Sequence, residues 1–136
     1  MGSTMIRSMI AAGLTLFLDQ TTKALAAALH LVVLNPGGAL SLGNQAPQFV
    51  LWGSLVVLLV MFFWWPSAPK NDQVLLAFIL SAGFSNLADR YTLGGVRDFI
   101  ALGWFPIFNV ADLILSVSVG WLLILTLFRP PHHPRA

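Results

Sequence analysis

The chain has 136 residues, of which 57% are hydrophobic and 9% are charged, and its mean hydropathy is +0.82. A soluble domain carries about 25% charged residues, so the composition excludes an ordinary globular protein and indicates a polytopic membrane protein. The formal net charge of +2 is spread thinly, which argues against nucleic-acid binding. The absence of cysteine excludes disulfides, thiol catalysis and thiolate metal sites.

Four apolar stretches follow one another along the chain and predict four transmembrane helices of about 20 residues each. The expected helices occupy residues 5–29, 48–65, 74–91 and 107–128. The first contains Arg7, an apolar run and three alanines, as a cleaved signal peptide would, but Asp19, Gln20 and Lys23 fall between the apolar run and the alanines. We therefore interpret it as a membrane helix. The prediction is an all-α membrane protein with one domain, residues 5–128.

The connections between these stretches differ in character. Residues 31–47 contain a β-favouring run followed by Asn35-Pro36-Gly37-Gly38, which predicts a short strand and a turn at the membrane surface. Trp64-Trp65-Pro66 combines interfacial aromatic residues with a helix stop. The tail, residues 129–136, contains three prolines and is expected to be disordered and cytoplasmic.

The charges on the two sides of the membrane predict its orientation. With four spans, both termini share one side, which receives Arg7, Lys70, Arg129 and Arg135 against Asp72. The other side receives Lys23, Arg90 and Arg97 against Asp19, Asp89, Asp98 and Asp112. The positive-inside rule then places both termini in the cytoplasm and gathers four aspartates at the outer face.

Those four aspartates are the sequence's main functional signal. An ionisable group at membrane depth costs at least about 2.5–3.5 kcal/mol, so each is a candidate functional residue. Asp98 and Asp112 lie at the two ends of the last outer connection, where two close carboxyl groups would share a proton and act as base and acid on water. The alternative is that each aspartate pairs with a cation for folding, for example Asp98 with Arg97 or Arg90. Spacing alone leaves both interpretations open.

Five short motifs, taken together, resemble one family. They are Asp19-Gln20-Thr21-Thr22-Lys23, Asn35-Pro36-Gly37-Gly38-Ala39, Asn86-Leu87-Ala88-Asp89-Arg90, Gly95-Val96-Arg97-Asp98-Phe99 and Phe108-Asn109-Val110-Ala111-Asp112. Each motif is weak alone, but their order on four predicted helices resembles lipoprotein signal peptidase, the bacterial type II signal peptidase family of membrane aspartic proteases. Zinc-peptidase and serine-hydrolase motifs are absent.

The resemblance implies a role for each matching residue. It makes Asp98 and Asp112 the catalytic dyad, with no metal and no cofactor. It implies substrate-binding or supporting roles for Asn35, Gly38, Asn86, Asn109, Asp19, Lys23, Asp89 and Arg90. For the two charged pairs, Asp19–Lys23 and Asp89–Arg90, a structural role is the preferred interpretation. The three asparagines could contact substrate or hydrogen-bond helix ends.

The implied substrate is a prolipoprotein that carries diacylglyceryl on the cysteine following its signal peptide, cut on the N-terminal side of that cysteine. The expected setting is the bacterial inner membrane, with membrane lipid around a monomer and the active site at its outer face. Phe99, Trp104 and Phe105 are either apolar groups near the dyad or membrane anchors.

The chain departs from the family's pattern in its outer segments. The stretches from Lys23 to Asn35 and from Phe99 to Phe105 are short, and Leu40 stands where phenylalanine is common. Arg97 occupies a usually apolar position and is expected to lower the pKa of its neighbour through proximity. Two alternatives therefore remain: a silent relative that binds lipopeptides, and a small proton-coupled transporter, although a transporter should carry its acid near the bilayer midplane.

Overall fold

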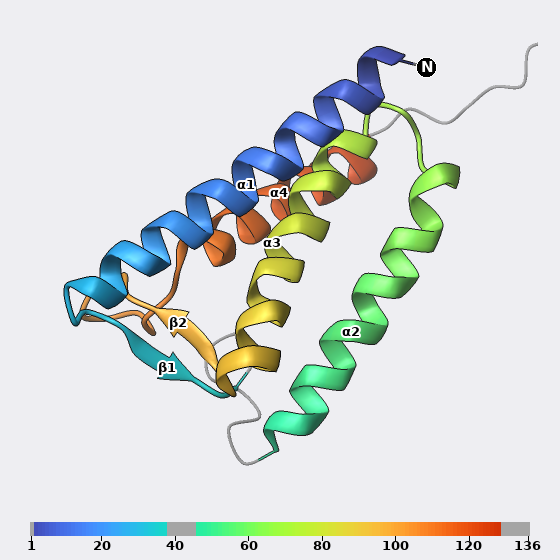
Figure 1. Cartoon of the computed structure of the whole chain (residues 1–136). Helices are drawn as coiled ribbons and strands as arrows, with labels where there is room; N and C mark the ends of the chain where they lie inside the picture. The colour runs from blue at the N-terminus through green and yellow to red at the C-terminus, as the bar shows by residue number, and fades with distance from the viewer. Residues whose placement is uncertain (1, 38–45, 129–136) are drawn as a thin grey trace, which may run out of the picture.

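The computed structural model describes residues 2–37 and 46–128, which form four helices and a small sheet (Figure 1). The helices are α1 (Gly2–Ala28), α2 (Pro47–Trp64), α3 (Gln73–Leu93) and α4 (Val110–Leu127), with a short 3-10 turn, η2 (Trp65–Ser67), after α2. The strands are β1 (Val33–Asn35) and β2 (Val96–Asp98). The predicted tail, Gly38 and Leu40 lie outside the described residues.

The bundle is built around α3, which packs against each of the other three helices. The helices pack against one another through small or medium-sized buried side chains, among them Ala11, Leu76, Ala82 and Ala111. Such residues let helices approach closely where lipid, rather than water, surrounds them. Helix α2 packs mainly on α3 and has no buried side chain, so it stands at the edge of the bundle (Figure 1).

Two helical segments, Pro47–Ser67 and Val110–Leu127, are long and apolar enough to cross a membrane among the described residues. Helix α1 carries Asp19 and Lys23, and helix α3 carries Asp89, in the halves that lie near the sheet, and these three charged side chains are buried inside the protein. Large apolar side chains face outward along the bundle, as expected for a protein surrounded by lipid. The prediction of a helical protein with a small β element after the first helix is therefore confirmed.

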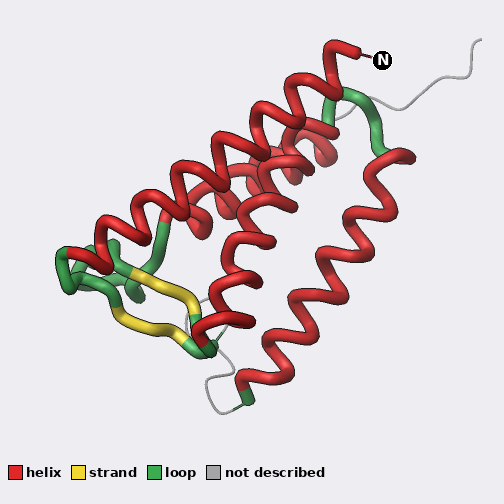
Figure 2. Tube along the Cα trace, in the orientation of Figure 1, coloured by secondary structure: helices red, strands yellow, loops and turns green. Residues whose placement is uncertain are grey.

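The two strands lie together at one end of the bundle, as Figure 2 shows in yellow. They pair antiparallel, with Val33 opposite Asp98 and Asn35 opposite Val96. The sequence predicted the first strand but not its partner, which lies 60 residues further along the chain. Gly95 permits the pairing, because a Cβ there would come within 3.0 Å of the Asn35 carbonyl oxygen.

The fourth helix begins at Val110, three residues later than predicted. Phe108 instead forms an isolated bridge with Ile100, which keeps that residue extended. Asn109 then caps the helix: its side chain accepts a hydrogen bond from the Asp112 N–H, and the Asp112 side chain accepts one from the Asn109 N–H. This capping box fixes the helix start more firmly than the apolar pattern could.

His30 ends α1 in the left-handed conformation, with φ at 58°. The N–H of Leu31 donates to the Ala26 carbonyl and that of His30 to the Ala27 carbonyl, which is the Schellman arrangement usually completed by glycine. We expect His30→Gly to raise the melting temperature in detergent, because glycine avoids a left-handed cost of about 1–2 kcal/mol. Differential scanning fluorimetry would check this, and a lowered melting temperature would contradict it.

Candidate active site

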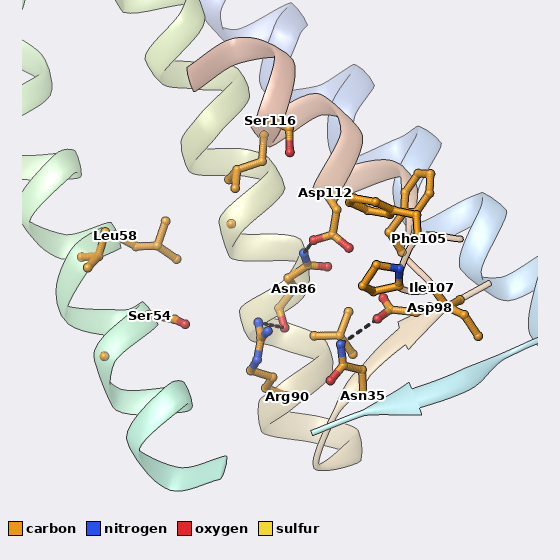
Figure 3. Close-up of a pocket in the computed structure, with 17 residues that line it drawn as sticks. Asn35, Ser54, Leu58, Asn86, Arg90, Asp98, Phe105, Ile107, Asp112 and Ser116 are labelled. Atoms are coloured by element: carbon orange, nitrogen blue, oxygen red, sulfur yellow. Dashed lines mark hydrogen bonds between the residues drawn. The ribbon is translucent and has the colours of Figure 1, made fainter. Parts of the chain in front are cut away.

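A cavity of about 390 Å³ opens beside the sheet, between α2, α3 and α4. Its polar end contains Asn35, Asn86, Arg90, Asp98 and Asp112. Its apolar lining comes from Val57 and Leu58 of α2, Leu115 of α4 and the segment 105–108. Figure 3 shows the polar side chains converging from both strands and from helices α3 and α4, with Ser54 and Leu58 facing them from α2. The structure therefore brings both predicted catalytic aspartates to one cavity.

Asp98 reaches the cavity from β2, and 2% of its surface is exposed. Asn35 donates a hydrogen bond to its Oδ2 at 2.9 Å, and Asn109 donates one to its Oδ1 at 2.7 Å. Asn35 can reach across the sheet because it pairs with Val96, which lies on the same face as Asp98. Both oxygens are thus held in place by amide donors.

Asp112 occupies the first turn of α4, where a negative charge is favoured by the helix dipole. Its Oδ1 accepts from the Asn86 side chain at 2.9 Å, and its Oδ2 accepts from the Asn109 N–H at 3.2 Å. Asn109 therefore touches both aspartates, one with its side-chain amide and the other with its backbone. The two carboxyl groups also lie close enough to interact electrostatically.

Burial raises the pKa of the Asp98 carboxyl above its ordinary value. Hydrogen bonds from Asn35 and Asn109, and the positive charges of Lys23 and Arg90, act in the opposite direction but are outweighed. A carboxyl group with a raised pKa can hold a proton at a pH where an exposed aspartate is ionised.

The expectation that Arg97 lowers the pKa of Asp98 is therefore wrong. Adjacent residues in a strand point to opposite faces, and the Arg97 guanidinium lies against Asp89 instead. Within the described part of the chain, Asp98 forms no salt bridge with either Arg97 or Arg90. This geometry does not support the alternative that Asp98 pairs with Arg97 or Arg90 for folding.

A buried group of charges supports the cavity from the α1 side. Lys23 is fully buried, and its Nζ contacts Asp19 Oδ2 at 2.6 Å and Asp89 Oδ2 at 3.2 Å. The same Nζ donates to Asn86 Oδ1 at 2.8 Å. Because lysine can only donate, it turns the Asn86 oxygen toward itself and the amide NH2 toward Asp112. Lys23 therefore orients a side chain that touches the dyad.

Asp19 joins three helices. Its Oδ2 accepts from Ser85 of α3 at 2.7 Å as well as from Lys23, and its Oδ1 accepts from the Ala111 N–H at 2.8 Å. The last contact satisfies a free donor at the start of α4. The expected Asp19–Lys23 pair is confirmed, and the structure adds Ser85, which the sequence analysis did not single out although it lies one helical turn before Asp89.

Asp89 and Arg90, for which a structural role was preferred, do not form an ion pair with each other among the described residues. Neighbouring residues of a helix point in different directions, and Asp89 faces Lys23 and Arg97 instead. The Arg90 Nη2 donates to the Gly37 carbonyl at 2.8 Å, which ties α3 to the turn after β1. Among the described residues, its Nε is buried beside the cavity and has no hydrogen-bond partner.

The three aromatic residues near the dyad take different positions. Phe105 lines the cavity and stacks edge-on with Phe108. Trp104 packs edge-on against Phe105 but is 84% exposed, as a membrane anchor would be. Phe99 is half-buried next to Asp98 and does not line the cavity. Across the described residues, no cluster of three or more His, Cys, Asp or Glu side chains could hold a metal ion.

The sequence was compared with known protein families and with curated proteins. A family model described as signal peptidase (SPase) II matches residues 11–128. The chain belongs to the signal peptidase II family. It is 35% identical to the lipoprotein signal peptidase of Nostoc punctiforme, over 86% of this chain and 78% of that protein. It is 41% identical to the Campylobacter jejuni enzyme of the same name, over 55% of this chain and 50% of that protein.

Solved structures agree with the family assignment. Two structures described as bacterial membrane enzymes match this fold with TM-scores of 0.75 and 0.71, each at 25% sequence identity. They cover 94% and 91% of this chain, and 94% of their own chains. The family resemblance seen in the five sequence motifs is confirmed, and the chain is a protease of the membrane.

Proposed function

We propose that this chain is an aspartic endopeptidase that removes the signal peptide from diacylglyceryl-modified prolipoproteins, cutting on the N-terminal side of the lipidated cysteine. The observation that carries the proposal is the pair Asp98 and Asp112, held by Asn35, Asn86 and Asn109 at the polar end of one cavity. The curated relatives named lipoprotein signal peptidase support the class of substrate.

The geometry suits general acid–base catalysis. In the proposed reaction, the ionised member of the dyad takes a proton from a water molecule, and the resulting hydroxide attacks the carbonyl carbon of the scissile amide. The protonated member donates its proton to the carbonyl oxygen. When the tetrahedral intermediate collapses, the C–N bond breaks, the leaving nitrogen receives a proton from one member of the dyad, and a hydroxyl group of the intermediate returns a proton to the other member. The two carboxyl groups interact, so the dyad titrates as a pair that can share one proton.

The cavity also suits a substrate that arrives within the membrane. It is bordered by α2 and α4, which are both apolar enough to cross a bilayer, and α2 packs mainly on α3. A lipidated signal peptide could therefore approach from the lipid between α2 and α4. We propose four spans in the inner membrane, with both termini cytoplasmic and the dyad at the outer face, because the sheet and the buried charges share one end of the bundle.

Cleavage of a purified diacylglyceryl prolipoprotein in detergent would test this function. Release of the signal peptide with the lipidated cysteine at the new N-terminus is the expected result, read by mass spectrometry. Binding without cleavage would favour the silent relative. The transporter is not favoured by the family assignment, and the two acids of the dyad lie in β2 and in the first turn of α4 rather than near mid-helix.

The pH dependence of cleavage provides a separate prediction. Catalysis needs one ionised carboxyl group, so the rate should fall as the pH drops through a pKa that burial has raised above the ordinary aspartate value. Asn35→Ala removes a hydrogen bond that stabilises the Asp98 carboxylate, which should raise that pKa further. We expect the acid limb of the pH profile of kcat to move to higher pH. An unchanged or lowered acid limb would contradict the role of Asn35.

A further inference from the structure

Arg97 precedes Asp98 in β2, and its side chain lies on the opposite face of the strand, against the helices. Its Nη2 donates to Asp89 Oδ1 at 2.7 Å, and its Nε donates to Asp89 Oδ2 at 3.2 Å. The backbone N–H of Arg97 donates to the same Oδ2 at 3.2 Å. A fourth bond, from Nη2 to Gln20 Oε1 at 2.6 Å, reaches α1.

These contacts add to the pairing of β2 with β1 and to the bridge between Ile100 and Phe108 that follows the strand. Each strand has three residues, and an isolated two-stranded sheet is marginally stable. Val96 is buried, but apolar burial does not fix a strand's direction. The bidentate bond between Arg97 and Asp89 has a defined geometry, and Asp89 is itself held by α3 and Lys23.

We propose that Arg97 is a positioning residue for Asp98. It holds the backbone one residue before Asp98 against Asp89 and Gln20, and so sets where the Asp98 carboxylate meets the cavity. Arg97 touches neither carboxyl group of the dyad, so it acts through the strand and not through its charge. The inference rests on the proposed function, since it needs Asp98 as a reacting group.

The test compares kcat and KM for the wild type, Arg97→Val and Arg97→Lys, using the diacylglyceryl prolipoprotein in detergent across a range of pH. Valine suits a strand but cannot hold Asp89, whereas lysine keeps the charge without the bidentate geometry. Arg7→Val is the matched control, because it removes an exposed arginine at the far end of α1. Thermal melts would establish that each variant is folded at the assay temperature.

We expect kcat to fall about 10- to 100-fold in Arg97→Val, as a displacement of about 1 Å would cause, with a small change in KM. Arg97→Lys should fall between Arg97→Val and the wild type, and Arg7→Val should match the wild type. The fall should be equal across the pH range, with the acid limb in place. A positioning role predicts this combination, and simple destabilisation does not, because each rate is measured on folded protein.

Three results would overturn the inference while leaving the proposed function intact. The first is full kcat in Arg97→Val, and the second is a loss confined to KM. The third is an acid limb that is displaced in Arg97→Val while Arg97→Lys has the full kcat of the wild type, which would indicate an electrostatic role. An inactive wild type would instead overturn the proposed function and this inference together. If Arg97→Val does not fold, Gln20→Leu removes one of the four bonds, and an unchanged kcat in that variant would contradict the inference.

Discussion

Replacing Asp98 or Asp112 by asparagine should lower the cleavage rate by about 10²- to 10⁴-fold, the range that a positioned acid or base contributes. Asparagine has nearly the same shape as aspartate but can neither accept the proton of water nor return one. Both side chains lie at the same cavity and are held by amide donors. The measurement is kcat on a diacylglyceryl prolipoprotein in detergent.

The controls for this experiment separate chemistry from folding. Each variant should elute as the wild type does on size exclusion and melt within a few degrees of it. Asp72→Asn is the matched control, because it removes a carboxylate from the start of α3, away from the cavity. Its kcat should equal that of the wild type. Normal turnover in either Asp98→Asn or Asp112→Asn would remove the dyad assignment.

Lys23→Met should produce the largest loss of stability, about 3–5 kcal/mol, which is typical when one partner of a buried ion pair is removed. Lys23 is fully buried and contacts Asp19, Asp89 and Asn86. Without it, two carboxylates remain buried together with less positive charge. Chemical denaturation in detergent micelles would measure the change, with Lys70→Met as the exposed control.

Asp19→Asn should be milder, since asparagine keeps an oxygen that can accept from the Ala111 N–H. We expect reduced activity that follows reduced stability. A variant that is fully stable yet inactive would instead argue that Asp19 takes a direct part in the reaction.

A Lys23→Met protein as stable as the wild type would show that the buried charges do not hold the helices together.

Local sequence features predicted the helices well because hydrophobic runs of membrane length have few alternative structures. The start of α4 was the exception. The apolar pattern places it near residue 107, but the Asn109 capping box and the bridge between Ile100 and Phe108 delay it to Val110. The second strand could not be predicted either, because a three-residue segment has no periodicity to detect and depends on a partner far along the chain.

The residues of the candidate site were predicted from their motifs, but their partners were not. Asp89 and Arg90 are adjacent in the sequence, but the helix turns them apart and Arg97 lies against Asp89. The α2 lining of the cavity gave no sequence signal, since Val57 and Leu58 resemble any other lipid-facing residues.

The sequence alone indicated a helical membrane protein that resembles signal peptidase II and predicted four aspartates at one face, because composition, apolar runs and ordered motifs are properties of the chain itself. Only the tertiary structure decided how those acids are held. Hydrogen bonds from Asn35, Asn86 and Asn109 depend on side chains that meet from four different elements. Their directions and distances arise when the elements pack, and no local pattern contains them.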